Sequence, residues 1–81
     1  INLEAVMVRV KTNTGHISFT MSYLPPNKKI LSNDFYNVMN LSNNAILFGD
    51  INSKHHLWDY YNNENTNGKK LLQICNSNNY I

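Results

Sequence analysis

Residues 46–52, with the sequence ILFGDIN, decide the expected architecture. Residues 45–48 are a short, continuous apolar run, which is typical of a strand buried on both faces, as in the centre of an α/β sheet. A glycine, an aspartate and, two residues after the aspartate, an asparagine follow this run. The stretch therefore predicts an interior strand that delivers polar side chains to one edge of a sheet.

Two stretches with alternating side chains lie upstream of this strand. Residues 3–11 alternate valines with mostly longer side chains, and residues 17–24 put apolar side chains on one face and hydroxyls on the other. Turn-forming residues that include Gly15 join the two stretches, so we expect a β-hairpin. Pro25 and Pro26 end the second strand, because proline cannot donate to a β-ladder.

Two helices complete the predicted set of elements. The first covers roughly residues 34–41, with Ser32 or Asn33 as its cap, and the second covers residues 69–78. Apolar side chains recur at helical spacing in both segments. A long polar segment with several aromatic residues, 49–67, precedes the second helix, and such a loop inside a compact domain is usually functional.

The predicted order of elements is that of a mixed α/β fold. With 81 residues the chain has room for one small domain at most. It does not begin with methionine, and Tyr80 and Ile81 are typical of the start of a further strand, so we expect residues 1–81 to be part of a domain truncated at both ends. A net charge of +2 is compatible with a nucleic-acid partner. A single cysteine excludes an internal disulfide, and no apolar run approaches a membrane span of about 20 residues.

Asp50 and Asn52 are the first candidates for chemistry. Side chains two residues apart in an extended chain point the same way, so both should lie at the carboxyl end of the strand, with Gly49 leaving room for a ligand. An aspartate can orient or deprotonate a water, and an asparagine amide can donate to a phosphate oxygen. The pair could serve a phosphodiester, but on spacing alone an Asx turn that ends the strand is the favoured interpretation.

The long loop holds further candidates. His55 and His56 could touch DNA phosphates or a metal, but adjacent residues of an extended segment point in opposite directions, so we do not expect them to share one ion. Trp58 could stack on a base, although an apolar anchor for the loop is the commoner role of such a residue.

Residues 49–52 (GDIN), 54–58 (KHHLW) and 67–72 (NGKKLL) together resemble the exonuclease–endonuclease–phosphatase superfamily. More narrowly, they resemble the apurinic-type endonuclease domain of non-LTR retrotransposons, as does the upstream segment 22–27 (SYLPPN). The resemblance covers roughly residues 17–81. Ile51 replaces the usual phenylalanine, and Asp59 replaces the usual glycine after Trp58, a change that bears on the conformation of that turn.

The resemblance implies roles for individual residues. Asp50 would activate the nucleophilic water, Asn52 would hold the scissile phosphate, and Tyr23 would contact that phosphate through its hydroxyl. Asn27 and His55 would contact the substrate.

The resemblance also implies an architecture and a reaction. The fold would be a four-layer α/β sandwich, in which two sheets packed face to face lie between helices. The reaction would be nicking of target DNA with Mg²⁺ or Mn²⁺ as cofactor. The implied partners are DNA and a reverse transcriptase domain in the same polypeptide, with action in the nucleus and no membrane association.

The family's other metal ligands, an early asparagine and glutamate and a late Asp-His pair, have no counterpart in residues 1–81. The sequence therefore assigns no metal ligand within this chain and leaves open whether it is an enzyme by itself. Two alternatives remain. The chain could belong to another phosphoesterase of the superfamily, a phosphatase or an exonuclease, or it could be a non-catalytic remnant of a mobile element.

Overall fold

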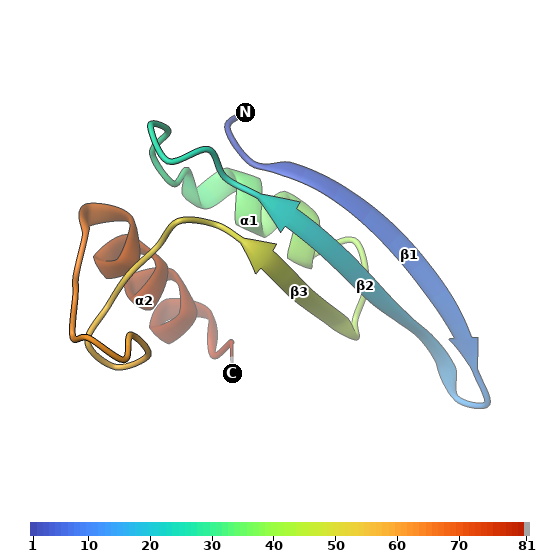
Figure 1. Ribbon diagram of the computed structural model, residues 1–81. Helices are drawn as coiled ribbons and strands as arrows, with labels where there is room; N and C mark the ends of the chain where they lie inside the picture. Colours follow the sequence, from blue (N-terminus) through green and yellow to red (C-terminus); the bar gives the residue numbers. More distant parts are fainter. Residues whose placement is uncertain (81) are drawn as a thin grey trace. The chain divides into compact units, whose positions relative to one another are not determined.

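The computed structural model describes residues 1–80, and the chain divides into two compact units, residues 1–51 and 52–81. The expected α/β class is confirmed as a three-stranded mixed sheet and two helices (Figure 1). Ile81, the second residue of the predicted final strand, lies outside the described residues. The elements of the first unit are β1 (Glu4–Thr12), β2 (Gly15–Tyr23), α1 (Ser32–Met39) and β3 (Ala45–Asp50), and that of the second unit is α2 (Thr66–Asn78).

Strands β1 and β2 form the predicted hairpin. They pair antiparallel along their whole length, and Thr12 is the partner of Gly15, so a two-residue loop joins them. Gly15 has φ +141°, a conformation that favours glycine. The Thr12 hydroxyl closes the turn by donating to the Gly15 carbonyl oxygen at 3.1 Å and accepting from the Thr14 N–H at 3.3 Å.

Strand β3 pairs with β2 in parallel, so the sheet has the order β1-β2-β3. The expectation of a strand buried on both faces is wrong for the described chain, because Ile46 and Phe48 are 50% and 49% exposed. The physical reason is that β3 is an edge strand of this sheet and that α1 covers only one face (Figure 1). An apolar run therefore did not indicate a central strand here.

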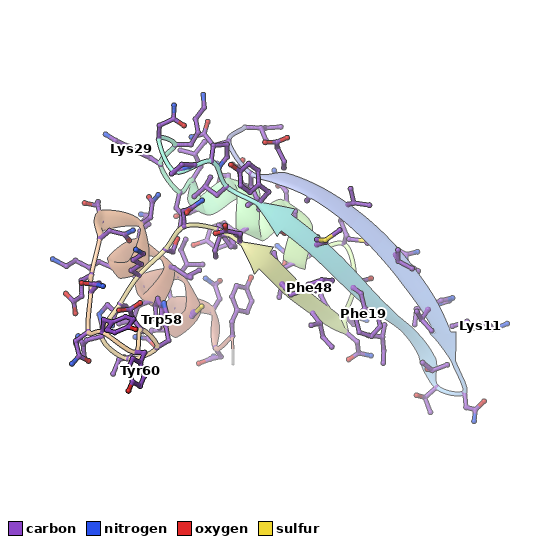
Figure 2. All side chains as sticks on the ribbon, viewed as in Figure 1. Lys11, Phe19, Lys29, Phe48, Trp58 and Tyr60 are labelled. Atoms are coloured by element: carbon purple, nitrogen blue, oxygen red, sulfur yellow. The ribbon has the colours of Figure 1, made fainter. Side chains whose placement is uncertain are left out.

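The two faces of the sheet differ in an unexpected way. The face that carries Ser18, Thr20 and Ser22 is buried, and their hydroxyl oxygens have no hydrogen-bond partner among the described residues. The opposite face is apolar and largely open, as the labelled Phe19 and Phe48 illustrate (Figure 2). The exposed members of this apolar face are Val6, Val8, Val10, Met21, Ile46 and Phe48.

Helix α1 begins at Ser32, so the prediction of Ser32 or Asn33 as its cap is wrong. The residue before the helix is Leu31, and no side chain caps the first turn. Asp34 instead serves the core: its Oδ2 atom accepts hydrogen bonds from the backbone N–H groups of Asn2 at 2.8 Å and Leu3 at 3.0 Å. This carboxylate ties the start of the chain to the helix. The buried apolar side chains of this unit are Leu3, Leu24, Ile30 and Phe35.

Helix α2 begins at Thr66, earlier than predicted, because Asn65 caps it. The predicted apolar stripe is confirmed: Ile74 is buried, while Leu71, Leu72 and Cys75 are half-buried. Partial burial raises the pKa of the Cys75 thiol above its ordinary value. In the part of the chain that the structure describes, neither helix has both the length and the apolar character needed to cross a bilayer.

Candidate active site at the end of strand β3

Strands β2 and β3 end side by side and place two candidate residues together. Tyr23 and Asp50 are direct partners in the parallel register, and the Leu24 N–H donates to the Asp50 carbonyl oxygen at 3.0 Å. Partner residues of neighbouring strands project from the same face of a sheet, so both side chains belong to the open face. Tyr23 is 44% exposed and Asp50 is also exposed, so both are accessible to a ligand.

The structure gives a reason for glycine at position 49 that differs from the predicted one. Its φ is +133°, and a Cβ atom built on it would lie 2.0 Å from the carbonyl oxygen of Ser22, its partner on β2. The space beside Gly49 is therefore filled by the β2 backbone and is not room for a ligand. The glycine lets β2 and β3 approach where Tyr23 and Asp50 come together.

Asn27, a predicted substrate contact, lies in the turn that follows β2. The Lys28 N–H donates to the Pro25 carbonyl oxygen at 3.0 Å, which closes a tight turn with Asn27 exposed inside it. Its contact with substrate stays a prediction.

Asn52 belongs to the second unit and does not continue the strand. Its φ is +47°, in the left-handed region, which asparagine tolerates better than most residues. Strand alternation therefore does not extend to Asn52, and the argument that its side chain must follow that of Asp50 loses its basis. The placement of the Asn52 amide on a phosphate stays a prediction.

Asn65 organises the segment that follows Asn52. Its Oδ1 atom accepts from the N–H groups of Lys54 at 2.9 Å and Gly68 at 2.7 Å, and its Nδ2 group donates to the Asn52 carbonyl oxygen at 3.0 Å. Gly68 is required beside it, because a Cβ there would lie 1.7 Å from the Lys54 carbonyl oxygen. Sequence reasoning missed Asn65, although asparagine is one of the residues preferred at a helix N-cap.

Trp58 and Asp59 fix the turn after the histidines. The Trp58 indole N–H donates to the Ser53 carbonyl oxygen at 3.0 Å, and the indole ring lies 5.1 Å from the His55 ring, which supports the anchoring role. The Asp59 Oδ2 atom accepts from the N–H groups of Tyr61 at 3.1 Å and Asn63 at 2.8 Å. The aspartate that replaces the family's glycine therefore builds its own turn.

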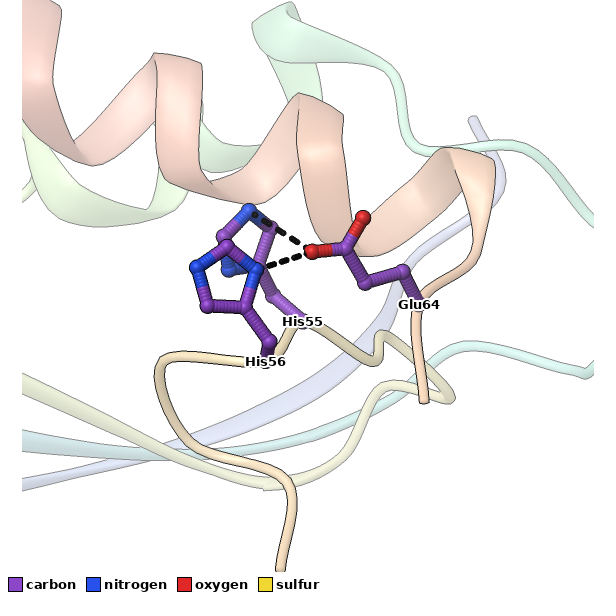
Figure 3. A group of neighbouring side chains, drawn as sticks. All are labelled: His55, His56 and Glu64. Atoms are coloured by element: carbon purple, nitrogen blue, oxygen red, sulfur yellow. Dashed lines mark hydrogen bonds and ion pairs between the residues drawn. The ribbon is translucent and has the colours of Figure 1, made fainter. Parts of the chain in front are cut away.

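His55, His56 and Glu64 form a cluster in the second unit (Figure 3). The two imidazole centroids are 4.3 Å apart, His56 Nδ1 is hydrogen-bonded to Glu64 Oε1, and His55 Nε2 lies 3.6 Å from the same oxygen. The expectation that the histidines point in opposite directions is wrong, because the chain turns at residues 56–58 instead of staying extended. The hydrogen bond from His56, with Coulombic attraction from both histidines, lowers the pKa of Glu64.

His56 and Glu64 were not predicted as partners. They are eight residues apart, and a turn without a periodic sequence pattern brings them together. His55 itself is buried, and its ring lies against that of Trp58. The substrate contact predicted for His55 stays a prediction.

Comparison with known proteins bears on this arrangement. The sequence matches the endonuclease-reverse transcriptase family over residues 17–81, which include most of β2, all of β3 and both helices. No curated protein and no solved structure matches the chain. The resemblance drawn from the motifs is confirmed. The chain therefore belongs to the endonuclease-reverse transcriptase family, as an endonuclease/exonuclease/phosphatase-type domain of a retrotransposon.

Proposed function

We propose that residues 1–81 are part of a metal-dependent endonuclease that hydrolyses phosphodiester bonds in target DNA during retrotransposition. The observation that carries the proposal is the direct pairing of Tyr23 with Asp50 at the carboxyl ends of parallel strands, in a chain of this family. The nicked strand would supply a primer end to a reverse transcriptase in the same polypeptide, acting in the nucleus.

Each residue has a role in the proposed reaction. The Asp50 carboxylate orients the attacking water or removes its proton. The Tyr23 hydroxyl donates a hydrogen bond to a non-bridging phosphate oxygen as negative charge builds there. The Asn52 amide does the same, while Asn27 and His55 contact the DNA outside the scissile bond.

Asp50 fits one ligand position of the expected Mg²⁺ or Mn²⁺ ion, because these cations prefer carboxylate oxygens. Glu4 lies in the same cross-strand row, through its pairing with Tyr23, but two strand spacings, or about 10 Å, separate it from Asp50. The remaining ligands would therefore come from parts of the domain beyond residues 1–81. A bound ion would stabilise the charge on the phosphate.

The open face of the sheet supports the four-layer sandwich proposed for the intact domain. Side chains such as Val8, Met21 and Phe48 are about half exposed on this face. A contiguous apolar face of this kind is normally buried, and in a sandwich the inner face of a second sheet covers it. The covering sheet would be contributed by the remainder of the domain.

The test is relaxation of supercoiled plasmid by the intact domain in Mg²⁺. Asp50→Asn should slow nicking by about 10³-fold, the contribution expected of a positioned general base. Asp59→Asn, the same change at a carboxylate that only builds a turn, should nick at nearly the wild-type rate. Residues 1–81 alone should not nick, because they lack the other metal ligands.

Other results would contradict the proposal in distinct ways. Wild-type nicking by Asp50→Asn would remove Asp50 from the mechanism. Hydrolysis of small phosphate esters or of DNA ends without plasmid nicking would favour a phosphatase or an exonuclease. An intact domain that is folded but inactive on all these substrates would favour a non-catalytic remnant.

A further inference from the structure

The cluster of His55, His56 and Glu64 has the composition of a metal site. One nitrogen from each histidine and one carboxylate oxygen from the glutamate lie within 4.8 Å of one another. Two imidazoles and a carboxylate are a common zinc-binding set, with at least one coordination position left for water or another ligand. All three residues belong to the second unit, so the cluster depends on that unit alone.

We propose that His55 Nε2, His56 Nδ1 and the Glu64 carboxylate bind one divalent transition-metal ion, of which Zn²⁺ is the best match. The site does not rest on the proposed endonuclease activity. Its donor set also differs from that expected around Asp50, because imidazole nitrogen favours zinc, copper or nickel, whereas Mg²⁺ prefers oxygen ligands and water.

The surroundings of the cluster favour a fixed site. His55 is 7% exposed, and its ring lies against the rings of Trp58 and His56. Its carbonyl oxygen accepts the N–H groups of Trp58 at 3.0 Å and Asp59 at 2.8 Å, which holds the backbone of the turn. Glu64 directly precedes Asn65, which is bonded to the Lys54 backbone. Both ends of the cluster are therefore attached to the same short framework.

The hydrogen bonds also show what metal binding must displace. The Leu57 N–H donates to His55 Nδ1 at 3.2 Å, so in the metal-free protein a neutral His55 carries its proton on Nε2, directed at Glu64. A metal at Nε2 requires the ring proton to lie on Nδ1, and the Leu57 contact must then open. We therefore expect reversible binding, because the ion must compete with this contact and with the hydrogen bond between His56 and Glu64.

An ion at this position would join the turn after Lys54 to the residue that leads into the cap of α2. The loop from Asn52 to Asn65 is otherwise held by hydrogen bonds from side chains to backbone and by isolated backbone–backbone bonds, such as that from the Asn65 N–H to the Lys54 carbonyl oxygen at 3.0 Å. Because a ligand that binds only the folded form stabilises it, Zn²⁺ should raise the melting temperature of the protein.

The test is calorimetric titration of Zn²⁺ into the protein, purified without a histidine tag. We expect one ion per chain and an affinity that falls by at least about tenfold in His56→Ala and in Glu64→Gln, since even lost supporting contacts to a metal ligand cost that much. His16→Ala and Glu4→Gln are the matched controls, because both residues lie in the other unit and should leave the affinity unchanged. Millimolar Mg²⁺ should not compete.

A second measurement protects the test against variants that fail to fold. In the wild-type protein, Zn²⁺ should shift the imidazole NMR signals of His55 and His56 and leave those of His16 in place. No binding by the folded wild-type protein, shifts at all three histidines, or equal loss of affinity in His16→Ala would overturn the site.

Discussion

The two units of this chain reach their conformations by different routes. In residues 1–51, three strands hold one another through backbone ladders, and the side chains mainly decide which face is covered. In residues 52–65, no strand or helix is present, and the path is set by the side chains of Asn65, Trp58 and Asp59 bonding to backbone groups.

This difference explains which substitutions should destabilise each unit most. The sheet is most sensitive where two backbones touch, as Gly49 and Ser22 do. The loop has isolated backbone hydrogen bonds and no ladder, so a single polar side chain such as that of Asn65 can carry much of its order.

Gly49→Ala should be the most damaging of these substitutions. The new Cβ would lie 2.0 Å from the Ser22 carbonyl oxygen at a φ of +133°, so β3 must move away from β2. We expect a loss of about 3 kcal/mol or more in the free energy of unfolding, measured by chemical denaturation. Gly15→Ala is the control: its φ is similar, but nothing lies within 4 Å, so only the backbone strain of about 1–3 kcal/mol remains. Equal losses would contradict the role assigned to the β2 contact.

Asn65→Ala should be the most damaging change in the loop. It removes two acceptor contacts and one donor contact, each worth about 1 kcal/mol, so we expect a loss of about 2–3 kcal/mol. Hydrogen exchange of the Lys54 and Gly68 amides should accelerate in the same variant. Asn65→Asp keeps the acceptor oxygen and should retain protection at both amides. Unchanged exchange in Asn65→Ala would show that other contacts hold the loop.

Thr20→Val should stabilise the protein by about 1 kcal/mol. Thr20 is 1% exposed and its hydroxyl has no hydrogen-bond partner among the described residues, so a methyl group of similar size removes an uncompensated burial cost. Thr12→Val is the opposite control, because the Thr12 hydroxyl bonds to Gly15 and Thr14 and its loss should destabilise the hairpin. Thermal unfolding measures both, and a lower melting temperature for Thr20→Val would indicate that this hydroxyl has a partner.

Asp59→Ala should have the smallest effect on stability, about 0.5–1 kcal/mol. It removes two hydrogen bonds in a turn that water can reach, so solvent compensates part of the loss. Asp59→Asn keeps an acceptor oxygen and should be close to neutral. A loss as large as that of Asn65→Ala would mean that the turn, and not the cap of α2, controls the loop.

The sequence predicted the first unit better than the second, for a physical reason. Alternation of side chains identified the two strands of the hairpin, and a short apolar run followed by glycine and aspartate placed the end of β3. It does not say which face is covered, because that depends on where the chain sends its helix; the hydroxyl face proved to be the buried one.

In the second unit, the helix stripe was predictable from its period, but the loop was not. His56 and Glu64 meet only because residues 56–58 turn, and Asn52 leaves the strand because its φ is positive. Neither the turn nor the positive φ of Asn52 follows from a repeating pattern of apolar and polar residues, so neither could be predicted from periodicity. At the candidate site, the pairing of Tyr23 with Asp50 was predictable in part, since the two strands were recognised but their register was not.

The measurement that tests the central claim most directly is a double-mutant cycle on nicking by the intact domain, using single-turnover rates in Mg²⁺. We expect a loss of about 10³-fold for Asp50→Asn and about 10²-fold for Tyr23→Phe, as for a lost general base and a lost donor to the developing oxyanion. Because both residues act on one phosphate, the double variant should lose clearly less than the product of the two single effects. A loss equal to that product, or a wild-type rate for either single variant, would contradict the claim that Tyr23 and Asp50 form one active site.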